Sequence, residues 1–146
     1  MRPFLLLSAV ALVGHATAAS AQKPAPAPMH HAAIKLADVA GTWDGKSMVG
    51  PKDSVVATFV VTATADGKGW TMKLPNRDPI PTRILTIGGD SIVTESGPFQ
   101  SILRPGQMVT TRTTGHYTGD TMTGTFEAHY ASGDVLRGKA AATRRK

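Results

Sequence analysis

The side chains best suited to catalysis or metal binding in this chain are its carboxylates and histidines. The 146 residues contain eight aspartates and two glutamates, and six of the aspartates fall at predicted turns. Aspartate favours such positions because its side chain accepts hydrogen bonds from nearby backbone N–H groups, which accounts for these six without any chemistry. They are Asp53, Asp66, Asp78, Asp90, Asp120 and Asp134. No pair of carboxylates is therefore expected to act as general acid and base.

Histidines occur in two places of interest. His116 and His129 lie on one face of a predicted hairpin, too far apart along it to share a metal ion. Met29-His30-His31 offers soft and imidazole ligands, but this spacing matches no defined metal site. A catalytic histidine would need an orienting carboxylate and an adjacent nucleophile. We predict a noncatalytic protein with no catalytic residues, no metal site and no cofactor.

The elements that position these side chains are clearest between residues 107 and 144, where two Gly-Asp turn signals separate three alternating segments. If Gly119-Asp120 is a two-residue hairpin turn, one face of the ladder is apolar and the other is polar. The apolar face pairs Tyr117 with Met122, Thr113 with Phe126 and Val109 with Tyr130. The polar face pairs Arg112 with Glu127, Thr114 with Thr125 and His116 with Thr123.

A second hairpin follows if Ser132-Gly133-Asp134 forms a three-residue loop. This loop places Leu136 opposite Tyr130 and Lys139 opposite Glu127. Both turns then bury the same face, and the glutamate lies between two basic residues in an exposed row of charge pairs.

Further strand and turn signals precede this region. Strands are predicted at 41–49, 54–64, 82–88, 91–96 and 99–104. A hairpin turn at Asp66-Gly67 would pair six apolar residues, Ala63 with Trp70, Val61 with Met72 and Phe59 with Leu74. Three prolines between Pro75 and Pro81 interrupt the sheet with a loop, a place where functional residues are common.

Sequential hairpins with no helix longer than a turn or two predict an all-β domain, an antiparallel up-and-down meander over residues 36–146. The meander has eight strands if the pieces around Gly97-Pro98 form one bent strand, and nine if they are separate. Closure into a barrel would remove exposed strand edges. An open β-sandwich is the alternative.

The N-terminal residues predict export. Residues 1–21 combine a positive start, a short apolar run and a small-residue cleavage site, as in a secretory signal peptide. Residues 22–35 alternate proline and alanine and are expected to form a flexible leader. The apolar run is too short to span a bilayer permanently, so we expect no transmembrane segment in the mature protein. The expected location is the periplasm or the exterior.

Composition limits the partners. The chain has no cysteine, hence no disulfide and no lipidation site after the signal. Its formal net charge is +6, which becomes +5 once Arg2 leaves with the signal. The basic residues are scattered rather than gathered in a stripe with aromatics, so nucleic acid is not an expected partner. Weak attraction to an anionic envelope surface is expected.

The tripeptide Gly41-Thr42-Trp43 resembles the Gly-x-Trp element of lipocalins, members of the calycin superfamily of small antiparallel barrels. The resemblance implies that Trp43 lies at the closed end of a calycin-like barrel and packs against an arginine near the end of the last strand. Arg144 shares the inward face of that strand and is the candidate. The segment 96–106 is also similar to one that recurs in small exported bacterial β proteins of uncharacterised role.

The inward face suggests a ligand site. Large apolar residues on it face small or hydroxylated ones such as Thr111 and Thr113, an arrangement that leaves a cavity or else fills the taper of a packed barrel. We predict that a small apolar or amphipathic molecule binds at the open end of the barrel. The expected lining residues are Phe59, Trp70, Met72 and Tyr130.

A second hypothesis belongs to another class of function. With a solid barrel, the loop 75–81 would engage a protein or envelope partner through Pro79, Ile80 and Pro81. A third, an enzyme that uses the barrel mouth, would require a titrating residue inside the barrel.

Overall fold

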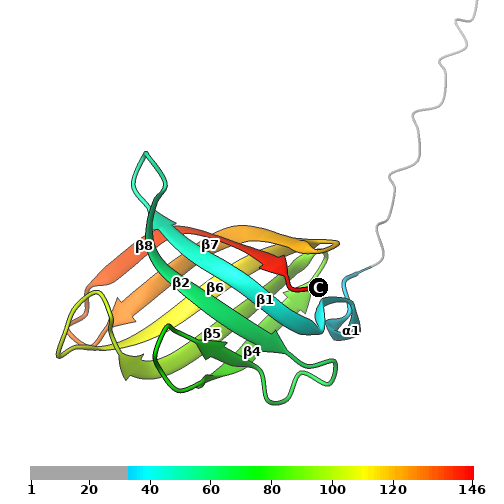
Figure 1. Cartoon of the computed structure of the whole chain (residues 1–146), viewed down its shortest axis with the longest axis horizontal. Coiled ribbons are helices and arrows are strands. Elements are labelled where there is room, and N and C mark those ends of the chain that lie inside the picture. The colour runs from blue at the N-terminus through cyan, green and yellow to red at the C-terminus, as the bar shows by residue number, and fades with distance from the viewer. Residues whose placement is uncertain (1–32) are drawn as a thin grey trace, which may run out of the picture. The chain divides into compact units, whose positions relative to one another are not determined.

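The computed structural model describes residues 33–146 and contains eight antiparallel strands, each paired with the next, that close into a barrel (Figure 1). The predicted all-β meander is thus confirmed, as a barrel and not a sandwich. The strands are β1 (Gly41–Val49), β2 (Ser54–Ala63), β3 (Thr71–Lys73), β4 (Ile80–Gly88), β5 (Ser91–Gln100), β6 (Met108–Thr118), β7 (Thr121–Tyr130) and β8 (Val135–Arg144). A short helix, α1 (Leu36–Val39), precedes them.

The strand count is eight because β5 continues through Gly97-Pro98. The pairing of β5 with β6 shifts between Ser96 and Phe99, so this part of the strand bulges without ending. Gly97 has a φ of +112°, and a Cβ there would lie 2.9 Å from the carbonyl oxygen of Val109. Glycine is needed here, because other residues neither adopt that φ readily nor fit the space.

The register predicted from the Gly119-Asp120 turn is confirmed along the whole of β6 and β7, from Tyr117 opposite Met122 to Val109 opposite Tyr130. The pairing of Val61 with Met72 is confirmed as well.

The β7–β8 register was wrong by two residues. The Tyr130 N–H donates to the Asp134 carbonyl oxygen at 2.9 Å, so the loop comprises residues 131–133 and not 132–134. Leu136 therefore faces Ala128, and Arg137 rather than Lys139 faces Glu127. Because side chains alternate with a period of two, this shift leaves every predicted inward residue of β8 facing inward.

The proline-rich loop is shorter than predicted. Ile80 and Pro81 belong to β4, and Ile80 is buried with Phe59 and Leu74. Pro81 is tolerated because it lies at the end of a ladder of only two pairs, with β3, a strand of three residues. The exposed segment is Pro75–Pro79.

The two ends of the barrel differ. At one end α1, the Gly89-Asp90 turn and the end of β8 lie together (Figure 1). Ile34, within the predicted leader, donates its N–H to the Gly89 carbonyl oxygen at 2.7 Å and packs against the core. We call this the closed end. At the opposite end, which we call the open end, lie the connections at 50–53, 74–79, 101–107 and 131–134. Residues 22–32 of the predicted leader, and the predicted signal, lie outside the described residues.

Trp43 on β1 and Arg144 on β8 connect the closed end to the seam where the first and last strands pair. They face each other across β1 and β8, with the guanidinium carbon 4.7 Å from the indole centroid, as the resemblance implied. The guanidinium donates to the carbonyl oxygens of Ala40, at 2.7 Å, and Asp38, just before β1, and of Gly119 in the β6–β7 turn. Trp43 Nε1 also donates to the carbonyl oxygen of Val39 in α1 at 2.8 Å.

Arg144→Ala is expected to lower the free energy of unfolding by about 2 kcal/mol, because it removes the cation–π contact and leaves carbonyl groups without donors. Arg144→Lys should recover part of the loss, since an ammonium keeps the charge but cannot reach all of these carbonyls. Urea unfolding measures both.

Arg145→Ala is the matched control. Arg145 pairs with Asp44 on the surface, and its side chain is 55% exposed, so the change should lower the free energy of unfolding far less than Arg144→Ala does. An equal loss in both alanine variants would contradict the role given to Arg144.

Candidate functional site

The barrel encloses a cavity of about 80 Å³. Strand alternation places its lining: every second residue points inward, so each strand offers the cavity a row of side chains spaced by two. The lining has two unlike walls. One is apolar and aromatic, and the other carries hydroxyl groups.

Two large side chains of the apolar wall lie over glycines. A Cβ at Gly45 would overlap the ring of Phe59, and a Cβ at Gly138 would overlap the ring of Phe126. Each ring therefore occupies the space that its opposite residue lacks. This is the pairing of small with large residues considered above, and it explains why the cavity is small.

The other wall is a group of five residues on β4, β5 and β6 that we call the hydroxyl cluster: Thr82, Thr94, Ser96, Thr111 and Thr113. Ser96 lies opposite Thr82 on one side and Thr111 on the other, and Thr94 lies opposite Thr113. Thr82 Oγ1 and Ser96 Oγ share a hydrogen bond of 2.6 Å. Among the described residues no hydrogen bond uses the hydroxyls of Thr94, Thr111 and Thr113.

The residues predicted to bind a ligand all line the cavity, but not all at its open end. Trp70 lies at the closed end, 1% exposed, in the cluster that contains Trp43. Its Nε1 donates to the Thr64 carbonyl oxygen at 2.9 Å, which holds the indole there. The expectation that Trp70 lies at the mouth was therefore wrong, because the β2–β3 connection that precedes it is at the closed end. Tyr130, at the end of β7, does lie at the open end.

The connection 101–107 lies over the mouth. Ile102 and Leu103 line the cavity although they are 36% and 41% exposed. Ser101 Oγ accepts hydrogen bonds from the N–H groups of Leu103, at 3.1 Å, and Arg104, at 3.0 Å. Arg104 lies 4.2 Å from the ring centroid of Tyr130, and its Nη1 is 2.8 Å from Asp134 Oδ2. The mouth segment is thus attached to the β7–β8 loop.

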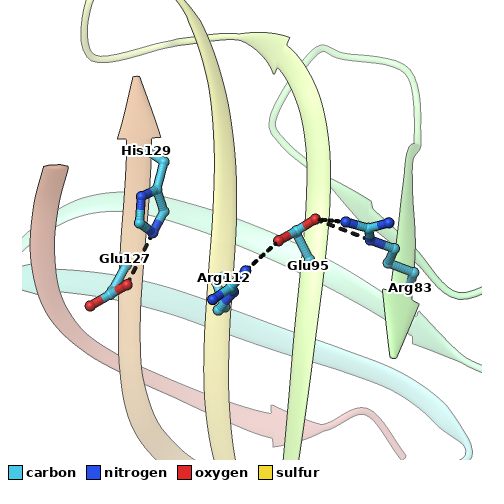
Figure 2. Close-up of polar contacts among 5 residues, drawn as sticks. All are labelled: Arg83, Glu95, Arg112, Glu127 and His129. Carbon is cyan, nitrogen blue, oxygen red and sulfur yellow. Dashed lines mark hydrogen bonds and ion pairs between the residues drawn. The ribbon is translucent and has the colours of Figure 1, made fainter. Parts of the chain in front are cut away.

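The outer face of the same strands carries a row of alternating charges, which we call the charge ladder: Arg83, Glu95, Arg112, Glu127 and Arg137. Figure 2 shows Glu95 between Arg83 and Arg112, with Glu127 and His129 on the next strand. Glu95 therefore has two arginine partners. Hydrogen bonds from Arg83 and then Arg112 hold the pKa of Glu95 below its ordinary value.

Of the two basic residues predicted to flank Glu127, Arg112 lies opposite it as expected, whereas Lys139 does not. The Glu127 carboxylate contacts Arg137 at 2.9 Å and His129 at 3.0 Å, and these bonds, Arg137 first, lower its pKa. Arg112 turns to Glu95 instead, and Lys139 pairs with Asp53 at 2.9 Å. The register shift in β8 explains the exchange of Lys139 for Arg137.

One trio resembles a catalytic triad in composition. His116 Nδ1 lies 2.8 Å from Ser91 Oγ and 3.1 Å from Asp90 Oδ1. A triad requires the serine and the carboxylate on different ring nitrogens, so that one takes a proton while the other orients the ring. Here both contact Nδ1. The hydrogen bond from His116, followed by that from Ser91, lowers the pKa of Asp90, and the trio ties β5 to β6 at the surface.

Within residues 33–146, no group of three or more histidine or acidic side chains is placed to hold a metal ion. The segment Met29-His30-His31, for which no metal site was predicted, lies outside the described residues. Over the same range, no helix combines the length and apolarity needed to cross a membrane.

Comparison of the chain with protein-family models, with curated proteins and with solved structures gives no match.

Glu95→Gln is expected to lower the free energy of unfolding at pH 7 by about 1 kcal/mol, a value reduced for the exposure of both arginines. Because the pKa of Glu95 is lower in the folded than in the unfolded chain, its contribution is present above the unfolded pKa and is lost as the pH falls through the folded one. The difference from the parent protein should therefore vanish in acid. Urea midpoints from pH 7 down to about pH 2 measure it.

Asp78→Asn, in the exposed segment Pro75–Pro79, removes a carboxylate outside the charge ladder and serves as control. A deficit in Glu95→Gln that persists unchanged at the lowest pH would show that packing, and not ionisation, is responsible.

Proposed function

We propose that the protein binds a small amphipathic molecule inside the barrel, entering at the open end. The observation that carries this proposal is the two-walled cavity, with hydrocarbon on one side and hydrogen-bonding groups on the other. Ligand pockets commonly have this composition, in which apolar surface supplies affinity and a few polar groups set orientation.

The volume limits the ligand. Pockets for drug-sized molecules measure roughly 300–1,000 Å³, and an apolar cavity of about 150 Å³ accepts benzene. A cavity of about 80 Å³ encloses only a few heavy atoms. The rest of a longer chain would pass out of the mouth, where Ile102 and Leu103 offer it exposed apolar surface.

We further propose that the protein is an exported, noncatalytic relative of the lipocalin-like barrels. The stacking of Trp43 on Arg144 at the closed end supports this kinship. Export rests on the sequence of residues 1–21, which lie outside the described range.

A second candidate is a protein- or envelope-binding domain acting through the proline-rich loop. The exposure of Pro75–Pro79 favours it. The burial of Ile80 removes the largest apolar side chain of the predicted contact from that surface.

The methionines provide a direct test. Met72 and Met122 line the cavity, whereas Met108 is 41% exposed and does not. With methyl-labelled methionine, titration of the full chain with 1-hexanol should shift the NMR signals of Met72 and Met122 saturably and leave Met108 in place. A ligand of this size is expected to bind with a Kd of roughly 0.1–10 mM.

A matched pair of surface variants locates the entrance. Leu103→Ser should weaken hexanol binding severalfold, while Ile87→Ser, a change of similar exposure near the closed end, should not. Shifts that never saturate, or that are equal at Met108, would refute binding in the barrel and leave the second candidate.

A further inference from the structure

The cavity walls consist of uncharged side chains. The described residues that line them contribute hydroxyl, hydrocarbon, aromatic and thioether groups. The charges of the same strands lie on the opposite face, because Arg83 follows Thr82, Glu95 lies between Thr94 and Ser96, and Arg112 lies between Thr111 and Thr113. Alternation thus directs the charge ladder outward and the hydroxyl cluster inward from the same three strands.

We propose that the cavity selects ligands whose polar group is uncharged, such as an alcohol or a primary amide, and discriminates against carboxylates and ammonium ions. The inference rests on the proposed function and adds the ligand's chemical class. The polar group meets the hydroxyl cluster, and the hydrocarbon part lies against the wall that contains Phe59 and Phe126.

The energetic reason is desolvation. An ion that leaves water must find an opposite charge or several strong hydrogen bonds, and otherwise costs several kcal/mol. A neutral hydroxyl or amide has a much smaller cost, which one or two hydrogen bonds offset. Threonine and serine hydroxyls both donate and accept, so they satisfy either kind of neutral group.

The geometry of the cluster indicates where that group binds. The hydroxyls of Thr82 and Ser96 already bond to each other at 2.6 Å. Thr94 and Thr113 lie directly opposite each other on β5 and β6, and side chains in such positions start about 5 Å apart. A single ligand oxygen between them is within reach of both hydroxyls.

Water is the competing occupant. The cavity of about 80 Å³ has room for ordered water molecules, and hydroxyl groups would hold them. A neutral ligand that displaces them must reproduce their hydrogen bonds. An ion must in addition lose its own hydration without meeting an opposite charge on the wall.

A series of six-carbon compounds tests the selectivity. The full chain is titrated at pH 7 with 1-hexanol, hexanamide, hexanoate and hexylammonium, and the Met72 and Met122 methyl signals report binding. Hexanol and hexanamide are expected to bind at least tenfold more tightly than either ion. Hexanoate or hexylammonium binding as tightly as hexanol would overturn the inference while leaving the proposed function intact. No saturable binding by any of the four would overturn both.

Two variants on one strand test the role of the cluster. Thr113→Val keeps the shape of an inward side chain and removes its hydroxyl, and Thr114→Val makes the same change on the outward face. Thr113→Val should weaken the binding of hexanol about three- to tenfold and reduce the ratio of hexanol affinity to hexanoate affinity. Thr114→Val should change neither quantity. Unaltered hexanol binding by Thr113→Val and by Thr94→Val, with the fold checked by the Met108 signal, would overturn the inference.

Discussion

Closure of the sheet between β1 and β8 is the constraint on which the other features of this protein depend. Only a closed sheet has an inside, and only then does alternation along each strand sort side chains into a lining and a surface. Trp43 and Arg144 lie where the first and last strands meet. Through the carbonyl groups that it contacts, the Arg144 guanidinium also connects α1 and the β6–β7 turn to this seam.

The strands β4, β5 and β6 illustrate how one piece of sheet serves two purposes. Outside, Arg83, Glu95 and Arg112 pair across the strands in water, where each pair contributes little by itself. Inside, the hydroxyl cluster occupies the alternate positions of the same ladder. A slip of one residue in either pairing would bury charges and expose hydroxyls, so the outer ladder helps to specify the register that lines the cavity.

Sequence patterns predicted this architecture where local chemistry determines it. The Gly119-Asp120 turn fixed every pair of β6 and β7 because a two-residue turn allows one register. In the β7–β8 hairpin, the prediction placed Gly133 in the middle of a three-residue loop. In the structure Gly133, with a φ of +96°, is the last residue of the loop. Pro81 was assigned to a loop because proline is excluded from central ladders, a rule that does not apply beside a strand as short as β3.

The site was predicted less completely for a physical reason. Which residues face inward follows from alternation, and hence Phe59, Met72 and Tyr130 were found. Thr94 and Ser96 were not singled out, although their spacing of two places both on one face of β5, and Thr82 was missed because it reaches the cavity through its pairing with Ser96. The size of the cavity could not be predicted, because it depends on how the rings of Phe59 and Phe126 settle over Gly45 and Gly138.

The central claim is that the barrel encloses a two-walled cavity that takes a neutral amphipathic molecule. A crystal structure of the protein soaked with 1-hexanol tests it most directly. We expect continuous density from the mouth at Leu103 into the barrel, with the hexanol oxygen about 2.8 Å from the hydroxyls of Thr94 and Thr113. A barrel whose side chains meet across the interior, with hexanol absent or bound only at the surface, would contradict the account.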